Sequence, residues 1–370
     1  MLWQVVIGFA QNKLLIKNVR VFDGEKLLEN TSVLIEGKLI AHLNVANCDD
    51  CTIIDGKGKT LLPGLTNAHV HAWSVFALIE AAKAGVLNVL DMHGVEQVQS
   101  YLKTFRDSTN YACYYVAGYA ATAPGGHGTQ FGFPVPTLLG PDDAKKFVND
   151  RIAAGADYIK IIIEPWKTTL SPETAKAIID EAHSHNKLAV VHISKVADAA
   201  QVLENNADGL VHIWWDKVMS DSELKKLADT RDFFVIPTLL TSIRAIEMIK
   251  KNNPKAVFLS EEALKSEVKR LYDAGVPIIA GTDPPNAQIN YGTDLFKELI
   301  LLSEAGISTI DVLKGATSIP IKKFNLGNKG MIKEGYLADM VLIDGNPFAD
   351  IHDITKIHTV WKAGKKVTLQ

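Results

Sequence analysis

Two histidines at the end of an apolar run could bind a metal ion together. His69 and His71 lie two residues apart in the run 65–71, so in a β-strand both side chains point to the same face. Imidazoles that converge from one strand end suit Zn²⁺ or a similar divalent ion. The pair alone is a weak signal, because neighbouring histidines often lie on a protein surface without a ligand.

Four more residues of ligand type occupy matching places in later apolar runs. They are Lys160 in 157–163, His192 in 188–193, His212 in 209–214 and Asp283 at the end of 276–283. Lys160, inside an apolar strand, must extend its ammonium group to water, lose its charge, or react with CO₂ to become an anionic ligand. Each of the four also fits a structural role, such as a hydrogen-bonded core histidine or an N-cap aspartate. Their shared placement near strand ends favours a common metal site.

The elements that would position these side chains begin near residue 62, where apolar strand-like runs alternate with helical stretches. The eight runs are 65–71, 86–92, 114–120, 157–163, 188–193, 209–214, 233–239 and 276–283, with helices expected at 171–185, 220–230, 294–306 and 308–318. Apolar strands that alternate with helices predict a parallel sheet covered on both faces. Eight such units close into an α/β (β/α)₈ TIM barrel, whose functional residues lie at the C-terminal ends of the strands.

Both ends of the chain have a different sequence pattern, in which short runs rich in β-branched residues are separated by turn residues. These runs fall within 13–62 and 338–363. We expect them to form one small β-sandwich domain that the barrel interrupts. The predicted division is therefore 1–62 and 326–370 for the β-sandwich domain and 63–325 for the barrel.

Composition narrows the classes of partner. The 370 residues carry a net charge of −3 with no basic block, which argues against a nucleic-acid partner. No apolar run reaches ~18 residues, so no membrane span is predicted. The expected partner is a small-molecule substrate, and the sequence leaves assembly into a homo-oligomer open.

The chain start and the cysteines bear on the cellular compartment. Residues 1–10 are apolar and uncharged and fit either the remnant of a signal peptide or a first strand, so cytoplasmic and periplasmic or secreted locations both stay open. Cys48 and Cys51 are interpreted as two surface thiols in a turn before a strand, because no second pair completes a zinc site. A disulfide between them is the alternative, and it would need an oxidising compartment.

Longer motifs resemble the amidohydrolase superfamily, in particular its zinc prolidase-like and imidazolonepropionase-like branch. The similar segments are Leu62-Pro-Gly-Leu-Thr-Asn-Ala-His-Val-His71, Gly155-Ala-Asp-Tyr-Ile-Lys160, Glu181-Ala-His183 with Val191-His192, Gly281-Thr-Asp283, and the tail 329–347. The resemblance extends from about residue 13 to 367 and is specific as a set. It implies a metal-dependent, dipeptidase-like hydrolase that cleaves an amide, peptide-like or cyclic amide C–N bond.

The resemblance also implies roles for individual residues. His69, His71 and Asp283 would bind the more buried of two Zn²⁺ or other divalent ions, a carboxylated Lys160 would bridge both, and His192 and His212 would bind the second. A metal-bound hydroxide would be the nucleophile, with Asp283 as proton shuttle.

A histidine in the glycine-rich segment Gly125-Gly-His-Gly128 also resembles the branch. His127 would reach over the metals and contact the carbonyl or carboxylate of the substrate. The simpler interpretation is a glycine-rich loop with an incidental histidine.

Some positions depart from the family pattern. Asn67 stands where the family usually has an acidic residue, and the segment 164–169 is shorter than the substrate loop of the branch. His93, His183 and His185 match no ligand position, and the last two are interpreted as helix-surface residues. Lys167 and Arg244 could pair with a substrate carboxylate or could equally be solvated.

Two other functions stay open. A mononuclear deaminase or imidazolone-type hydrolase would hold one ion with His69, His71, His192 and Asp283 and leave Lys160 unmodified. A non-catalytic scaffold relative would be expected to have lost ligands, and none is missing.

Overall fold

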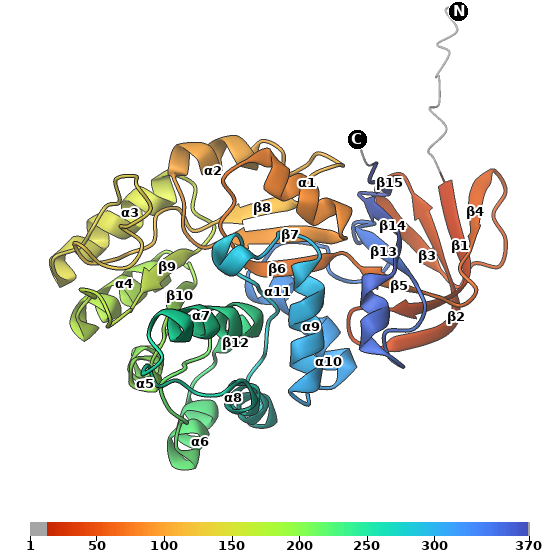
Figure 1. The fold of residues 1–370 in the computed structure, drawn as a ribbon. Coiled ribbons are helices and arrows are strands. Elements are labelled where there is room, and N and C mark those ends of the chain that lie inside the picture. Colours follow the sequence, from red (N-terminus) through yellow and green to blue (C-terminus); the bar gives the residue numbers. More distant parts are fainter. Residues whose placement is uncertain (1–12, 369–370) are drawn as a thin grey trace, which may run out of the picture.

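Residues 13–368 are described in the computed structural model of this protein. The apolar segment 1–10, interpreted as a signal remnant or a first strand, lies outside the described residues. Figure 1 shows a part in which helices lie outside a set of parallel strands, and a β-rich part beside it. In the described part of the chain, no helix has both the length and the apolar character needed to cross a bilayer.

Seven of the eight predicted apolar runs contain a parallel strand. The first three form one sheet, β6 (Leu65–Val70), β7 (Val86–Asp91) and β8 (Cys113–Val116), and the next four form another, β9 (Ile159–Ile162), β10 (Ala189–His192), β11 (Gly209–Val211) and β12 (Phe234–Ile236). Every residue of β6, β7, β8, β9, β11 and β12 is buried, as expected for strands covered on both faces.

A few backbone hydrogen bonds outside the regular strands join the two sheets at both edges. On one side, the amide of Ala121 donates to the carbonyl of Lys160 at 2.8 Å. On the other side, the segment 276–283 lies between β12 and β6, because the amide of Ile279 donates to Val235 and that of Ala68 to Ala280, both at 2.9 Å. This segment, predicted as the eighth strand, forms an isolated bridge at Ile278 instead. The fold is TIM-barrel-like, although regular strand pairing among the described residues does not run the whole way round.

Helices lie along the outside of the parallel strands. Their bounds are α1 (Val75–Lys83), α2 (Glu96–Lys103), α3 (Ala144–Ala153), α4 (Pro172–Ser184), α5 (Val196–Glu204), α6 (Asp221–Thr230), α7 (Leu239–Asn252), α8 (Glu261–Asp273), α9 (Asp294–Glu304), α10 (Thr309–Gly315) and α11 (Ser318–Lys323), with 3₁₀ turns at Pro141–Asp143, Asn286–Gln288 and Ile351–Thr355. The helices predicted at 171–185 and 220–230 are α4 and α6. The one predicted at 308–318 ends at Gly315, because Thr317 has non-helical φ and ψ angles of −135° and −87° before α11 begins.

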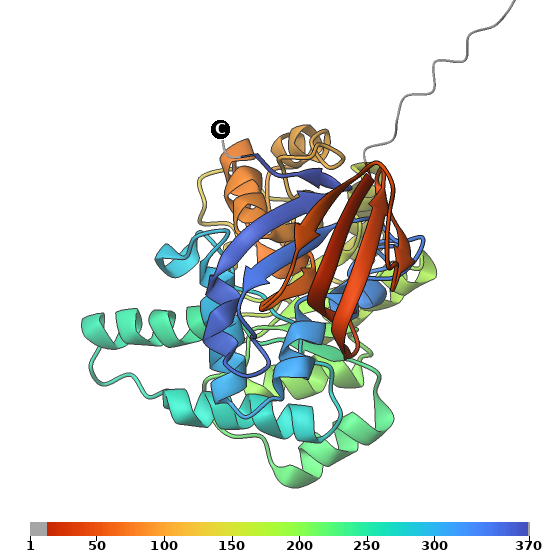
Figure 2. The same ribbon diagram turned by 90° about the vertical axis from the view of Figure 1, so that its right-hand side faces the viewer.

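The β-rich part is a single hydrogen-bonded sheet built from both ends of the chain. Its strands are β1 (Lys13–Phe22), β2 (Leu27–Glu36), β3 (Leu39–Leu43), β4 (Cys51–Asp55), β5 (Lys59–Pro63), β13 (Met340–Asp344), β14 (Ile357–Lys362) and β15 (Lys365–Lys366). Antiparallel pairing of β13 with β5 joins the two chain ends, and Figure 2 shows the red and blue strands side by side. Because the pairing defines one sheet, the expected two-layered β-sandwich is not confirmed.

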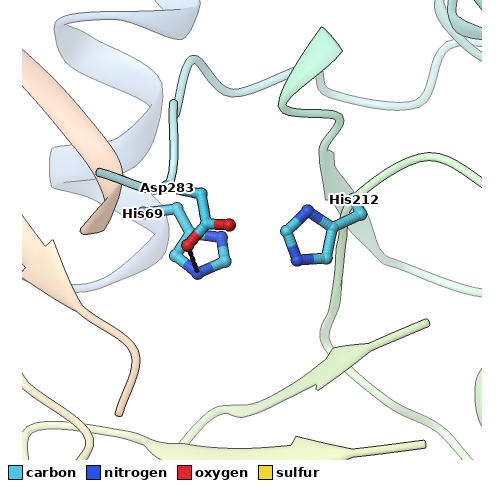
Figure 3. Close-up of side chains that lie close together, drawn as sticks. All are labelled: His69, His212 and Asp283. Carbon is cyan, nitrogen blue, oxygen red and sulfur yellow. Dashed lines mark ion pairs between the residues drawn. The ribbon is translucent and has the colours of Figure 1, made fainter. Parts of the chain in front are cut away.

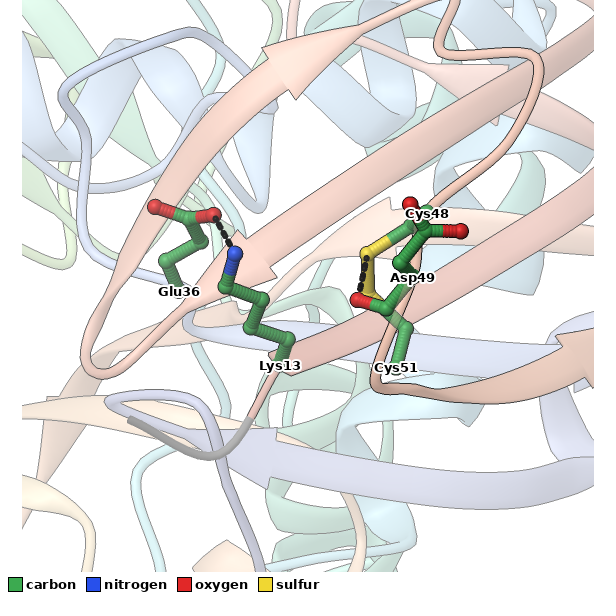
Figure 4. The surroundings of a disulfide bond; sticks show 5 residues. All are labelled: Lys13, Glu36, Cys48, Asp49 and Cys51. Carbon is green, nitrogen blue, oxygen red and sulfur yellow. Dashed lines mark hydrogen bonds and ion pairs between the residues drawn. A yellow bond between two sulfur atoms is a disulfide. The ribbon is translucent and has the colours of Figure 1, made fainter. Parts of the chain in front are cut away.

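Cys48 and Cys51 are joined by a disulfide, which Figure 4 shows beside the ion pair of Lys13 and Glu36. The interpretation of the two cysteines as free thiols is therefore wrong. Asp50 has a left-handed φ of 60°, and this turn brings the two Cα atoms to 5.7 Å, within the usual range for a disulfide. The turn itself lies just before a strand, as predicted.

Candidate metal centre

One pocket collects all seven predicted site residues at the C-terminal ends of the parallel strands. The pocket has a volume of about 340 Å³, and the predicted residues in its lining are His69, His71, His127, Lys160, His192, His212 and Asp283. β6 contains His69 and ends just before His71, β9 contains Lys160, β10 ends at His192, and β11 ends just before His212. Parallel strands bring their C-terminal ends to one edge, so residues far apart in sequence meet there.

His69, His71 and Asp283 form the tightest cluster. Oδ1 of Asp283 lies 2.9 Å from Nε2 of His71 and 3.2 Å from Nε2 of His69, and the two Nε2 atoms are 3.2 Å apart. Figure 3 shows His69 and Asp283 in contact, with the ring of His212 facing them. Asp283 and His212 have φ angles of 61° and 71°. Such left-handed backbone in non-glycine residues is costly and concentrates at functional sites.

The hydrogen bonds of His71 fix its tautomer. Its Nδ1 lies 2.9 Å from the carbonyl oxygen of His93, which only accepts, so Nδ1 carries the proton. Nε2 is then left with its lone pair toward the carboxylate of Asp283. Two acceptors this close need a proton or a cation between them. Burial lowers the pKa of His71, but the hydrogen bond and the negative charge of Asp283 raise it overall. The cluster therefore favours a positive charge, either a proton or a cation, between these two side chains.

His192 and His212 lie beside this cluster and are also oriented by hydrogen bonds. Nδ1 of His212 is 2.6 Å from Oγ1 of Thr238, which leaves Nε2 free. Nε2 of His192 is 3.0 Å from Oε2 of Glu164, so this nitrogen donates and Nδ1 keeps a lone pair. The ring centres of His192 and His212 are 4.6 Å apart, and those of His212 and His69 are 5.0 Å apart.

Lys160 lies in this group with its ammonium nitrogen buried and without a hydrogen-bond partner among the described residues. Burial lowers the pKa of Lys160 to about 7, although the negative charge of Asp283 acts in the opposite direction. Near neutral pH, the Lys160 side chain is therefore an uncharged amine in a large fraction of the molecules. An uncharged amine is the form of lysine that reacts with CO₂.

The residues present fit a divalent metal ion. Burial lowers the pKa values of His69, His192 and His212 well below the usual range, so these imidazoles are neutral, as metal ligands must be. Ligand atoms of His69, His212 and Asp283 all lie within 4.8 Å of one another. Neutral imidazoles with a carboxylate are a donor set that suits zinc.

His127 lies over this group in the loop after β8. Its ring centre is 4.9 Å from that of His192 and 5.5 Å from that of Trp166. Burial lowers the pKa of His127, while the charge of Glu164 opposes the shift. Its Nδ1 is 3.1 Å from the side-chain nitrogen of Gln130, so the loop holds the ring in place.

Sequence reasoning missed Glu164. This side chain is only 2% exposed, contacts His192 through one oxygen and accepts a 2.6 Å hydrogen bond from Oγ of Ser194 through the other. The available signal was an acidic residue directly after the apolar run 157–163. His183 and His185 lie outside the pocket, where His183 pairs with Asp208 at 2.8 Å.

Known proteins resemble this chain in sequence and in fold. The family model described as the amidohydrolase family matches residues 60–367. Ochratoxinase from Aspergillus niger is 22% identical, and the alignment covers 93% of this chain and 84% of that protein. A 5-methylthioadenosine/S-adenosylhomocysteine deaminase from Dictyoglomus turgidum is 24% identical, and the alignment covers 95% of this chain and 89% of that protein. The crystal structure of a Xaa-Pro dipeptidase with bound methionine superposes with a TM-score of 0.82 at 21% identity, covering 96% of this chain and 99% of that one. The structural likeness supports the TIM-barrel-like fold.

The matched residues cover most of the chain and include the pocket with its histidines, Lys160 and Asp283. Members of this family include amide hydrolases and deaminases, both of which act on C–N bonds. The chain belongs to the amidohydrolase family and is an enzyme that acts on C–N bonds.

Proposed function

We propose that this enzyme hydrolyses an amide, peptide-like or cyclic amide bond at a centre of two zinc ions. His69, His71 and Asp283 would hold one ion, His192 and His212 the other, and a carboxylated Lys160 would bridge them. The observation that carries the proposal is Lys160, a buried amine that has no hydrogen-bond partner among the described residues and lines the same pocket as the neutral His192 and His212.

Divalent ions bound there would polarise a carbonyl group and lower the pKa of a water molecule. The protein's own residues supply the rest. Asp283 would accept a proton and pass it to the leaving nitrogen, a role that its position beside His71 in the pocket supports. His127 would donate a hydrogen bond to the substrate carbonyl, a role that its position in the pocket lining near His192 supports.

A second candidate is a deaminase with one ion and an unmodified Lys160. It is favoured by the tight grouping of ligand atoms of His69, His212 and Asp283 and by the likeness to a deaminase. The number of ions per chain separates the two candidates.

The proposal extends to the architecture. The segment 276–283 would act as the eighth strand of a closed (β/α)₈ barrel spanning 63–325. Residues 1–62 and 326–370 would make up the second domain as a β-sandwich.

Elemental analysis of zinc-loaded protein, with mass spectrometry for carboxylation, tests the metal centre. We expect two ions per chain in the wild type and fewer in Lys160→Ala. His183→Ala is the matched control, since this histidine pairs with Asp208 outside the pocket. One ion per chain with an unmodified lysine would favour the deaminase candidate, and hydrolysis of neither amides nor aminopurines would contradict both.

A further inference from the structure

The outer wall of the pocket is apolar and partly open to solvent. Beyond the metal-type residues it is lined by Phe131, Trp166, Ile213, Trp215, Met248 and Ile249. Trp166 is 58% exposed, Met248 52% and Phe131 41%. Large apolar side chains that stay exposed around a concave site mark a surface that a ligand covers.

Positive charge is scarce in the same lining. Among the described residues that line the pocket, Lys160 is the one lysine and there is no arginine. Lys160 belongs to the proposed metal centre, so it is not available to a charged group of the substrate that lies against the apolar wall. The other charged lining residues, Glu164 and Asp283, are acidic.

The two cations that the sequence suggested for a substrate carboxylate are outside this lining. Arg244 donates hydrogen bonds to the carbonyls of Ala287 and Gln288, both at 3.3 Å, and lies 3.8 Å from Asp294. Lys167 lies with its nitrogen 5.3 Å from the ring centre of Trp166. Neither residue lines the pocket.

We propose that the substrate is a neutral amide whose group beyond the scissile bond is an apolar alkyl or aryl group without a carboxylate. The inference rests on the proposed hydrolytic function and narrows it. Lys167 lies against Trp166, and Arg244 is engaged with two backbone carbonyls. A carboxylate placed against Trp215 and Met248 would therefore lose water and gain no cationic partner from the described lining residues, which is unfavourable. An aryl or branched alkyl group would instead bury apolar area there, and a pocket of about 340 Å³ suits a small molecule of this kind.

A matched pair of compounds tests the proposal. N-acetylphenethylamine and N-acetylphenylalanine have the same amide and aromatic ring and differ by one carboxylate. We expect the zinc-loaded enzyme to hydrolyse the neutral compound with a kcat/KM at least about tenfold higher, since the pocket wall offers the carboxylate no partner. A preference for N-acetylphenylalanine would overturn the inference and leave the proposed hydrolytic function standing.

A positive charge introduced into the pocket wall provides a second test of the proposal. Met248→Lys places an ammonium group at a half-exposed site that takes no part in the metal centre. We expect it to raise the relative kcat/KM for N-acetylphenylalanine, whereas Ile53→Lys, at a 57% exposed site in β4, should leave the ratio unchanged. An unchanged ratio in Met248→Lys would contradict the placement of the substrate against this wall.

Binding separates this inference from the hydrolytic function. If the zinc-loaded protein hydrolyses neither compound, quenching of the tryptophan fluorescence, to which Trp166 and Trp215 contribute, still reports the dissociation constants of both compounds. Tighter binding of the neutral compound would support the inference even though the hydrolytic proposal failed for this pair. Equal or tighter binding of the carboxylate compound would overturn the inference.

Discussion

The buried contact between Glu164 and His192 gives a measurable prediction about metal affinity. Nε2 of His192 donates to Glu164 at 3.0 Å, and Ser194 donates to the other carboxylate oxygen at 2.6 Å. The carboxylate thus fixes both the tautomer and the ring orientation of a predicted ligand. Groups that orient a ligating histidine in this way typically contribute 10–100-fold to metal affinity.

The size of the effect depends on what replaces the carboxylate. Glu164→Gln keeps one oxygen that can accept from His192, but it loses the negative charge, so we expect about a tenfold loss of zinc affinity, or about 1.4 kcal/mol. Glu164→Ala leaves His192 without an acceptor, so we expect a loss nearer a hundredfold, or about 2.7 kcal/mol.

Competition with a chromophoric chelator measures zinc affinity in each variant, and thermal melting checks the fold. Asp208→Asn is the matched control, because Asp208 pairs with His183 at 2.8 Å as a carboxylate–imidazole pair outside the pocket. It should leave zinc affinity unchanged. Wild-type zinc affinity in a folded Glu164→Ala protein would refute the reasoning.

Three further predictions concern other buried ionisable groups. Asp283→Asn should keep the fold and most of the metal but lose on the order of 10²–10⁴ in kcat, because the basic group is gone; near-normal turnover with full metal, measured on one sample, would end the catalytic interpretation. Wild-type zinc content by elemental analysis should rise when bicarbonate is added during loading, and Lys160→Ala should show no such rise, whereas equal behaviour of the two would contradict carboxylation. Burial raises the pKa of Glu298 to about 8, although hydrogen bonds from the backbone amides of Leu240 and Leu239 act to lower it. The folded state therefore holds this proton to higher pH than the unfolded state, so the free energy of unfolding should fall as pH rises from about 4.5 to 8 and then level off. Thermal melts across this range should show a smaller fall in Glu298→Gln, and an identical slope would contradict the assignment.

Strand periodicity made much of the centre predictable. A period of two places His69 and His71 on one face, and the eight apolar runs place the later candidates at the same edge of the fold. These inferences need no knowledge of loop conformation, because the parallel strands alone bring Lys160, His192 and His212 together.

Features that depend on single backbone torsions were not predictable. The disulfide of Cys48 and Cys51 depends on the left-handed turn at Asp50. The segment 276–283 bonds to both neighbouring strands but pairs as an isolated bridge at Ile278, a difference in local geometry that its apolar pattern does not encode. The contact of Glu164 with His192 crosses from the end of β9 to the end of β10, and it requires a loop conformation that strand patterns do not encode.

The contacts of its amide group show what Asn67 does at a position where the family pattern has an acidic residue. Its oxygen accepts hydrogen bonds from the backbone amides of His69, at 3.2 Å, and Thr282, at 3.0 Å, while its nitrogen donates to Oγ1 of Thr282 at 2.7 Å. A carboxylate at this position could accept the same two amide hydrogen bonds and receive a third from a rotated threonine hydroxyl. Asn67 therefore ties β6 to the segment that carries Asp283 without adding a buried charge, so that His69 and Asp283 are held close together by bonds that do not depend on a metal ion.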